Sequence, residues 1–236
     1  MIKGVFAMTP PLVRDMTRPL EVRRLGLIGY ADALAMQRAL VEERRADRVP
    51  DLLLLLQHPA VITLGVKGDG GRSNILAARE RLQELGITVE ETGRGGDVTY
   101  HGPGQVVGYP ILDLRPDRCD VHRYVRDVEE VMIRVCADYG LTAGRIKGLT
   151  GTWIGAEKIG AIGIRISRWI TSHGFALNVS TNLEQFHLIV PCGIADRGVT
   201  SIERATGRRV AIDEVEDRLV HHFADVFDRE PVTTVA

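Results

Sequence analysis

The 236-residue sequence predicts a single α+β domain with a mixed, largely antiparallel sheet and flanking helices. Strand and helix patterns mix along the chain without the strict alternation of a doubly wound fold. The stretch 151–180 is rich in Ile, Val, Thr, Trp and Gly, which indicates consecutive antiparallel strands joined by tight turns. The stretches 121–139 and 213–227 carry apolar residues at three- and four-residue steps, which indicates two helices with one buried face each.

The first half of the chain combines short apolar runs with helical spacing. A helix is expected over 30–48, and Pro50 ends it. Ser73 is expected to cap a second helix that runs to about Leu85, with Gly86 just after its end. Pro110 lies inside a predicted strand and argues for an edge or a bulge. The strands expected in this half are 22–29, 51–57, 61–65, 87–91 and 105–114.

The second half begins with the clearest helix, which Asp120 caps and Gly140 ends. Tight turns are expected at Gly155-Ala156 and near Arg168. They separate three strands, expected over 152–154, 158–167 and 170–179. We expect residues 1–20 to form a loosely ordered leader, 21–230 the domain, and 231–236 a tail.

Composition narrows the classes of function. A net charge of −1 gives the chain no general attraction to nucleic acid or to an anionic membrane. The longest purely apolar run, Leu52 to Leu56, is far shorter than the roughly 20 residues of a membrane-spanning helix. Three widely spaced cysteines, without a Cys-x-x-Cys or His-Glu-x-x-His motif, argue against a disulfide framework or a structural metal. We therefore expect a cytoplasmic protein that needs no metal or other cofactor.

The stretch Arg-Gly-Gly-Asp-Val-Thr-Tyr-His-Gly-Pro-Gly-Gln at 94–105 organises the candidate site. Glycine permits backbone angles and close approaches that side chains forbid, and proline fixes one torsion. The stretch is typical of a rigid wall of backbone donors with a few aimed side chains. These side chains are Arg94, Asp97, Thr99, Tyr100 and His101.

Cys192, between Pro191 and Gly193, is the candidate nucleophile. The backbone amides of Cys192 and Gly193 could stabilise an oxyanion, although a free cysteine can equally be a small buried apolar residue. A nucleophilic thiol needs a base or a cation nearby. His101, His173 and Lys158 are the candidates, but Lys158 also fits a solvated hairpin end and His173 also fits a core position.

Two runs of small residues, 160–163 and 174–176, fall within predicted strands. Glycine weakens a strand unless something must approach it closely. These runs indicate either a groove floor shaped for an extended apolar ligand or tight packing within the sheet.

Four of these stretches, in this order, resemble the lipoyl(octanoyl) transferase family, the LipB-type octanoyltransferases. They are 94–105, Lys-Ile-Gly-Ala-Ile-Gly at 158–163, His-Gly-Phe-Ala-Leu-Asn at 173–178 and Ile-Val-Pro-Cys-Gly-Ile at 189–194. Flanking matches lie at 53–59 and 199–202, and the resemblance runs from about Val22 to the last helix. Asp97 departs from many relatives, which carry glutamine or lysine there, so it receives no specific role.

The resemblance implies a catalytic domain of the biotin/lipoyl protein ligase type. It implies transfer of an octanoyl group from octanoyl-acyl carrier protein to lipoyl domains of 2-oxoacid dehydrogenase complexes and to glycine cleavage H protein. Cys192 matches the acyl-accepting cysteine and Lys158 the lysine that supports it, with His173 a candidate assistant. The matching substrate-binding residues are Arg94, Gly95, Gly96, Asp97, Val98, Thr99, Tyr100, His101, Ala161, Ile162, Gly163, Gly174, Phe175 and Ala176.

Three other functions stay open at this point. An ATP-dependent lipoate–protein ligase would share the fold but would need no cysteine nucleophile. A cysteine thioesterase would need water and a histidine base, which His101 or His173 could supply. A non-enzymatic acyl-binding module would carry an unreactive thiol.

Overall fold

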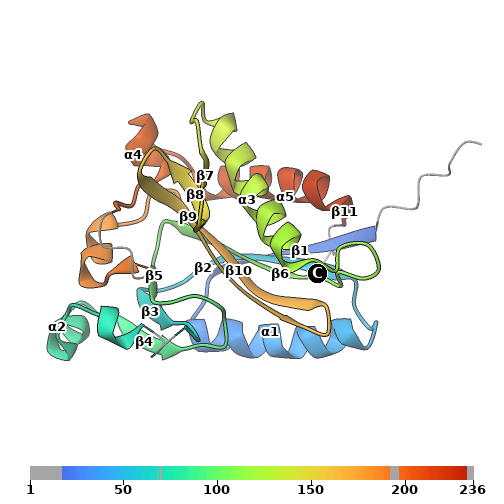
Figure 1. Ribbon diagram of the computed structural model, residues 1–236, viewed down its shortest axis with the longest axis horizontal. Coiled ribbons are helices and arrows are strands. Elements are labelled where there is room, and N and C mark those ends of the chain that lie inside the picture. The colour runs from blue at the N-terminus through green and yellow to red at the C-terminus, as the bar shows by residue number, and fades with distance from the viewer. Residues whose placement is uncertain (1–17, 68, 70, 192–196, 233–236) are drawn as a thin grey trace, which may run out of the picture.

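The computed structural model describes residues 18–67, 69, 71–191 and 197–232. Its centre is an eight-stranded sheet in the order β11-β1-β2-β6-β10-β9-β8-β7. Helix α1 (Tyr30–Arg45) covers one face of this sheet, and α3 (Val121–Asp138) and α5 (Ile212–Phe227) cover the other (Figure 1). A three-stranded sheet, β4-β3-β5, lies beside the large sheet. The architecture confirms the predicted α+β fold.

The large sheet is mixed because β1 pairs in parallel with β2 and β11, whereas the other neighbouring pairs are antiparallel. Its strands are β1 (Arg18–Leu27), β2 (Asp51–Gln57), β6 (Gln105–Ile111), β7 (Gly144–Ile146), β8 (Leu149–Ile154), β9 (Glu157–Ser167), β10 (Ile170–Asn178) and β11 (Arg229–Val232). The small sheet holds β3 (Val61–Leu64), β4 (Thr88–Glu91) and β5 (Thr99–His101). Short helices are α2 (Arg79–Glu84), α4 (Ile202–Thr206) and the 3-10 turns η1 (Arg72–Asn74) and η2 (Leu183–Leu188).

The domain has one hydrophobic core on each face of the large sheet, and neighbouring residues of a strand belong to different cores. Successive side chains of a strand point to opposite faces of the sheet. On β10, Phe175 and Leu177 join the core under α3 and α5, whereas Ala176 joins the core under α1. The candidate site lies on the α1 face, because Thr99, His101 and the small residues of β9 and β10 meet there.

Both tight turns predicted around β9 are present. Ile154 pairs with Glu157 across Gly155-Ala156, and Gly155 has a φ of 56°. Ser167 pairs with Ile170 across Arg168 and Trp169, whose φ values are 52° and 67°. Two successive positive φ values give the local twist that suits a two-residue hairpin.

The helix expected from Ser73 to about Leu85 is wrong. The chain makes a 3-10 turn, continues extended, and becomes helical only in α2. Leu76 and Ala77 both donate backbone hydrogen bonds to Leu188 O, at 2.8 and 3.2 Å. This pairing with a distant segment overrides the local capping signal. Gly86, with a φ of 66°, follows the end of α2 as predicted.

Pro110 does not lie on an edge strand, because β6 pairs with β2 on one side and β10 on the other. The regular pairing is instead interrupted between β6 and β10, because their register ends at the pair Phe175–Gly108, before it reaches Pro110. Beyond that point the Thr171 hydroxyl donates to Pro110 O at 2.7 Å and accepts from Leu112 N–H at 2.9 Å. A side chain thus replaces the backbone hydrogen bonds that the ladder lacks.

The expected domain boundaries fall inside two strands. β1 begins at Arg18 and pairs from there with Arg229, and β11 continues to Val232. Leu20 is fully buried, so residues 18–20 belong to the folded domain. The rest of the expected leader and tail, 1–17 and 233–236, lies outside the described residues.

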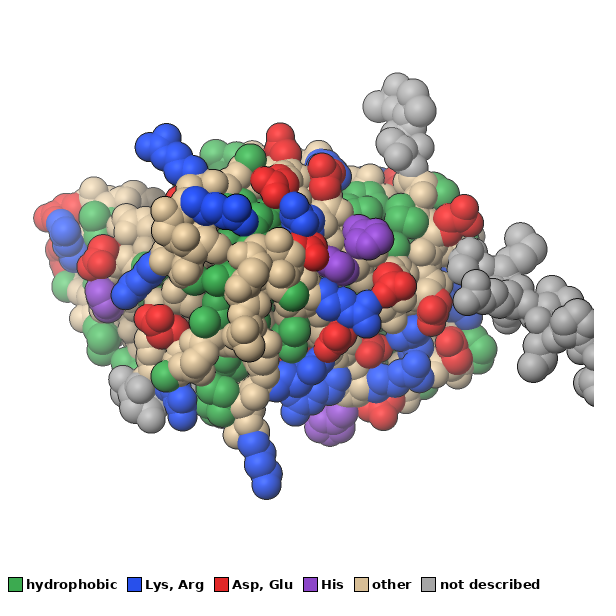
Figure 2. All heavy atoms as spheres, turned by 90° about the horizontal axis from the view of Figure 1, so that it is seen from above, with side chains coloured by type: hydrophobic (Ala, Val, Ile, Leu, Met, Phe, Trp, Pro, Cys, Tyr) green, Lys and Arg blue, Asp and Glu red, His purple; other side chains and the backbone are tan. Residues whose placement is uncertain are grey.

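The described part of the chain holds no helix that is long and apolar enough to cross a membrane. It also holds no group of three or more His, Cys, Asp and Glu side chains that could bind a metal. Basic and acidic side chains are interspersed on the face that carries α3 and α5 (Figure 2). Arg134, for example, pairs with Glu130 and Asp225 there.

We predict that Thr171→Val lowers the free energy of unfolding by about 1–3 kcal/mol, because it leaves the buried Leu112 N–H without its acceptor. Urea unfolding measures this change. Thr88→Val, in the exposed strand β4, is the matched control and should change stability by less than about 0.5 kcal/mol. Equal effects of the two substitutions would contradict the bridging role of Thr171.

Candidate functional site

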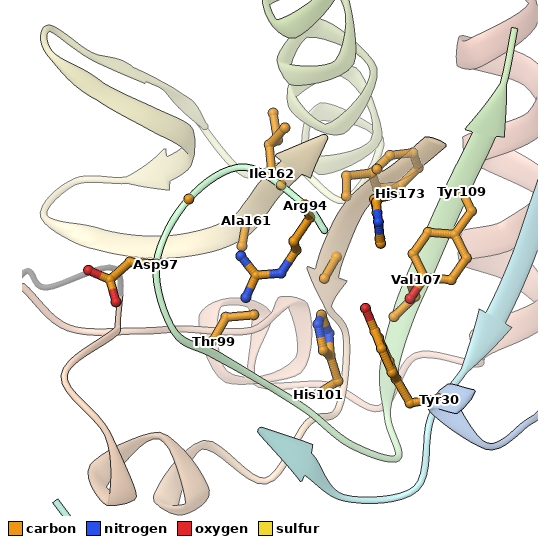
Figure 3. Close-up of a pocket in the computed structure, with 15 residues that line it drawn as sticks. Tyr30, Arg94, Asp97, Thr99, His101, Val107, Tyr109, Ala161, Ile162 and His173 are labelled. Atoms are coloured by element: carbon orange, nitrogen blue, oxygen red, sulfur yellow. The ribbon is translucent and has the colours of Figure 1, made fainter. Parts of the chain in front are cut away.

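A cavity lies on the α1 face of the large sheet, between strands β9 and β10 and the loop 92–98 (Figure 3). It brings together residues that are far apart in the sequence. The lining residues are Tyr30, Arg94, Gly96, Asp97, Thr99, His101, Val107, Tyr109, Ala161, Ile162, Gly163, His173, Gly174, Phe175 and Ala176. Most of the substrate-binding residues predicted from the sequence therefore lie around one space.

The floor of the cavity consists of small residues on neighbouring strands. Ala161 pairs with Ala176, and Gly163 pairs with Gly174. A Cβ atom on Gly163 would lie 2.8 Å from Arg94 Cδ, and one on Gly174 would lie 2.1 Å from the carbonyl oxygen of Gly108. Both glycines are therefore required by close approaches, one to the cavity wall and one within the sheet.

Arg94 forms a wall of the cavity above Gly163. Its Nη2 donates to Thr63 O at 2.7 Å and to Thr63 Oγ1 at 2.9 Å, and its Nη1 donates to Gly95 O at 3.1 Å. Gly95 N–H in turn donates to Ile164 O on β9 at 2.8 Å. These bonds join β3 of the small sheet to β9 of the large sheet and hold the guanidinium in place.

Residues 98–101 divide between the cavity and a separate core. Thr99 and His101 line the cavity, whereas Val98 and Tyr100 point the other way and pack in the core of the small sheet. Tyr100 packs edge-on against Phe186, and its burial raises the pKa of the phenol to about 12. Val98, Tyr100 and Gly95 thus support the wall without lining the cavity, as strand alternation requires.

Asp97 stands at the margin of the cavity and points away from Arg94 and His101 (Figure 3). Its carboxylate accepts hydrogen bonds from Asn74 Nδ2 at 3.1 Å and from Val98 N–H at 2.6 Å. Gly71 leaves the room for this carboxylate, because a Cβ atom there would overlap Asp97 Oδ1. Asp97 therefore orders the loop.

The side-chain amides of Gln105 and Asn178 determine which ring nitrogen of His101 carries the proton. Gln105 Nε2 donates to Tyr100 O at 3.3 Å and to Asn178 Oδ1 at 2.9 Å, so Gln105 Oε1 faces His101. His101 Nδ1, 2.7 Å from that oxygen, must carry the proton. Asn178 is oriented in turn by its bond to Thr200 O at 3.0 Å. The arrangement leaves His101 Nε2 as a hydrogen-bond acceptor.

Both candidate histidine bases are neutral rings. Burial, aided by His58 and Arg94, lowers the pKa of His101 to about 3. Burial, aided by Arg94, Arg165 and Arg38, lowers the pKa of His173 to about 4. Such rings bind protons weakly near pH 7 and are better suited to accept hydrogen bonds and fill space than to remove protons.

Lys158 lines a second, smaller cavity together with Pro191, Val199 and Phe186. This cavity shares Thr99, Ala161 and Ala176 with the first, so the two cavities adjoin at these small residues of the floor. Lys158 is buried, and its Nζ lies 4.8 Å from the centroid of the Trp153 ring. Its backbone is held by Gly198 O and Thr200 N–H, each at 2.9 Å.

Cys192 lies outside the described residues, but Pro191, which precedes it, lines the cavity that holds Lys158. The other two cysteines are poor candidates for a nucleophile. Cys136 is fully buried in the core under α3, and this burial raises the pKa of its thiol to about 12. Cys119 donates a hydrogen bond to Leu114 O at 3.6 Å, away from the cavity.

Sequence reasoning missed three aromatic groups of the cavity: Tyr30, Tyr109 and His58 behind them. His58 Nδ1 donates to Ile28 O at 2.8 Å, so its Nε2 accepts from the Tyr109 hydroxyl at 2.8 Å. Tyr30 stacks near His101, with ring centroids 6.5 Å apart. In the sequence these residues look like core aromatics or strand ends, and no local signal marks them as cavity residues.

Known protein families and curated relatives that match this chain come from protein lipoylation. The model of the lipoyl protein ligase A/B catalytic domain matches residues 29–224. An octanoyltransferase of Solibacter usitatus is 54% identical over 209 residues, which cover 89% of this chain and 93% of that protein. An octanoyltransferase of Myxococcus xanthus is 52% identical over 219 residues, 90% of this chain but only 61% of that protein's length.

Solved structures share the fold at low identity. A lipoate-protein ligase A bound with ATP has a TM-score of 0.68 and 18% identity, and the match covers 93% of this chain and 90% of that one. A bipartite lipoate protein ligase of Thermoplasma acidophilum, studied with its E2 lipoyl domain, has a TM-score of 0.66 and 18% identity over 94% and 88% of the two chains. At these identities the likeness establishes the fold alone.

We predict that stability falls as pH drops below about 6.5, the ordinary pKa of histidine in an unfolded chain. Because the pKa of His101 in the folded state is about 3, the unfolded chain binds protons first, and stability is lost between these two values. At pH 5 this ring accounts for a loss of about 2 kcal/mol. Urea unfolding at pH 7 and pH 5 measures it.

His101→Gln should reduce the loss between pH 7 and pH 5 by about 2 kcal/mol. His187→Gln, at an exposed position, is the control and should keep the loss of the unmodified protein. A loss that is the same in all three proteins would show that His101 is not held neutral in the folded state.

Proposed function

The chain belongs to the lipoyl protein ligase A/B catalytic-domain family, and we propose that it is an octanoyltransferase of protein lipoylation. The proposed donor is octanoyl-acyl carrier protein. The proposed acceptors are lysines of lipoyl domains, in 2-oxoacid dehydrogenase complexes and in glycine cleavage H protein. The observation that carries this proposal is that the cavity of Lys158 and Pro191 adjoins the cavity floored by small residues, with Thr99, Ala161 and Ala176 lining both.

The proposed catalytic unit is the domain spanning 21–230, together with the strand ends that pair at its border. Within it, the floor of Ala161, Gly163, Gly174 and Ala176 supports binding of an extended apolar chain. Val107 adds apolar surface from β6. Burial of methylene groups against such a surface supplies the binding free energy, at about 0.8 kcal/mol for each group.

In the first proposed step the Cys192 thiolate attacks the carbonyl carbon of the donor thioester. A new thioester forms on Cys192, and the thiolate of the carrier leaves and takes a proton from the Lys158 ammonium, which becomes a neutral amine. One thioester replaces another, so the step needs no ATP. Lys158, as a cation beside the residue that precedes Cys192, favours the thiolate.

In the second proposed step the amine of the acceptor lysine attacks the Cys192 thioester. An amide forms, the Cys192 thiolate leaves, and the amine loses a proton for which Lys158 in its neutral form is the proposed acceptor. An amide is more stable than a thioester, which gives the reaction its direction. Two half-reactions through one covalent intermediate imply ping-pong kinetics.

A lipoate ligase is the second candidate, because solved ligases share the fold and one of them is bound with ATP. The identity of about 50% to octanoyltransferases outweighs this likeness of 18%. A thioesterase is disfavoured by a separate observation. With pKa values of about 3 and 4, neither His101 nor His173 is basic enough to activate water efficiently at neutral pH.

We predict that mixing the protein with octanoyl-acyl carrier protein, without ATP, adds one octanoyl group to the enzyme in intact-mass spectra. Cys192→Ala should abolish the adduct, and Cys119→Ala, the control, should keep it. Addition of a lipoyl domain should then move the group to that domain. An adduct that persists on Cys192→Ala, or transfer that requires ATP, would contradict the proposed mechanism.

We predict that Lys158→Met raises by about one unit the pH at which iodoacetamide alkylates Cys192, because the variant loses the cation that favours the thiolate. Lys147→Met, which removes an exposed lysine, is the control and should leave the profile unchanged. The alkylated cysteine is identified by peptide mass. An unchanged profile in Lys158→Met would remove Lys158 from this role.

A further inference from the structure

His173 has an unusual backbone conformation for a residue within a strand. Its φ is 55°, a left-handed value that non-glycine residues adopt at a cost and that is concentrated at functional sites. Its backbone N–H donates to Gln37 Oε1 on α1 at 2.8 Å instead of to a strand. The ring is almost fully buried, and its Nδ1 has no hydrogen-bond partner among the described residues.

The His173 ring stands between two hollows. On one side it lines the cavity described above, where it meets Tyr109 edge-on with ring centroids 6.5 Å apart (Figure 3). On the other side it lines a groove between α1 and the β9–β10 hairpin, together with Leu34, Arg38, Val41 and Arg165. Among the described residues, His173 alone lines both hollows.

The distance along the floor matches a medium-length acyl chain. Ala161 pairs with Ala176 where the cavity of Lys158 meets the larger one, and Ile164 pairs with His173 three residues further along. Three residues of strand span about 10 Å, close to the length of an extended eight-carbon chain. A chain whose carbonyl end lies where the two cavities meet, and which follows the small residues, would therefore end against the His173 ring.

We propose that His173 is a specificity-determining residue that ends the acyl cavity and sets the length of the straight-chain acyl group that the protein accepts. The inference rests on the proposed octanoyl transfer. The strained backbone places the ring across the floor, where a regular strand residue would continue the groove. The residue acts as a stop, and the acyl chemistry does not involve it.

Because a groove lies beyond the His173 ring, a variant without the ring should gain activity toward longer acyl chains. Leu34, Val41 and Ile170 give the groove apolar walls, and its charged lining residues are Arg38, Glu42, Arg45 and Arg165. Removing the ring would join the groove to the cavity. The last carbons of a longer chain would then lie against Leu34 and Val41.

The experiment compares octanoyl-, decanoyl- and dodecanoyl-acyl carrier proteins as donors to the unmodified protein, His173→Gly, His173→Asn and Ser172→Ala. Glycine and asparagine both tolerate a positive φ, so these variants keep the backbone. Ser172 lines only the groove, so Ser172→Ala is the matched control. Formation of the acyl-enzyme is followed by intact mass, and folding by thermal unfolding.

We expect the unmodified protein to be acylated at least tenfold more slowly by dodecanoyl than by octanoyl donors. The dodecanoyl-to-octanoyl ratio should rise by about tenfold in His173→Gly, rise less in His173→Asn, and stay unchanged in Ser172→Ala. Equal ratios in folded His173→Gly and the unmodified protein would overturn the inference. Equal rates for all three donors with the unmodified protein would also overturn it, even if no variant folds.

These outcomes are distinct from failure of the proposed function. If no donor acylates the unmodified protein, octanoyl transfer through Cys192 is wrong. If octanoyl acylates it and the length profile does not depend on residue 173, the transfer stands and the role of His173 as a stop is wrong.

Discussion

The candidate site depends on one close approach, in which the guanidinium of Arg94 crosses Gly163. Only a residue without a side chain leaves room for Arg94 at that point, because a Cβ atom on Gly163 would lie 2.8 Å from Arg94 Cδ. Arg94 then bonds to Thr63, while Gly95 bonds to β9. These contacts bring the small sheet and the large sheet together, and the space left between them is the cavity. Wall and floor therefore depend on each other.

The sequence was a good guide wherever local pattern and tertiary structure agree. The amphipathic helix that begins after Asp120 forms as expected, with the Asp120 side chain accepting from Arg123 N–H. The strands around Gly155 and Arg168 also form, because hairpins depend on neighbouring residues. Of the stretch 94–105, which the sequence predicts to be a wall, Thr99 and His101 line the cavity, whereas alternation turns Val98 and Tyr100 away from it.

Expectations failed where distant contacts decide the structure. Pairing of 76–77 with Leu188 replaces the helix expected after Ser73, and the Thr171 hydroxyl allows Pro110 into a central strand. The same limit applies at the site. Nothing in the sequence shows that Tyr30, at the start of α1, meets His101, or that the backbone of His173 is left-handed. His173 was expected as a candidate assistant in chemistry, and its geometry instead supports a role in shaping the cavity.

The most direct test of the account is a crystal structure of the protein acylated with an octanoyl group. We expect the chain to begin at Cys192 beside Lys158, pass over Ala161 and Ala176, and end against the His173 ring. An octanoyl chain bound elsewhere, or one attached to another residue, would contradict the account.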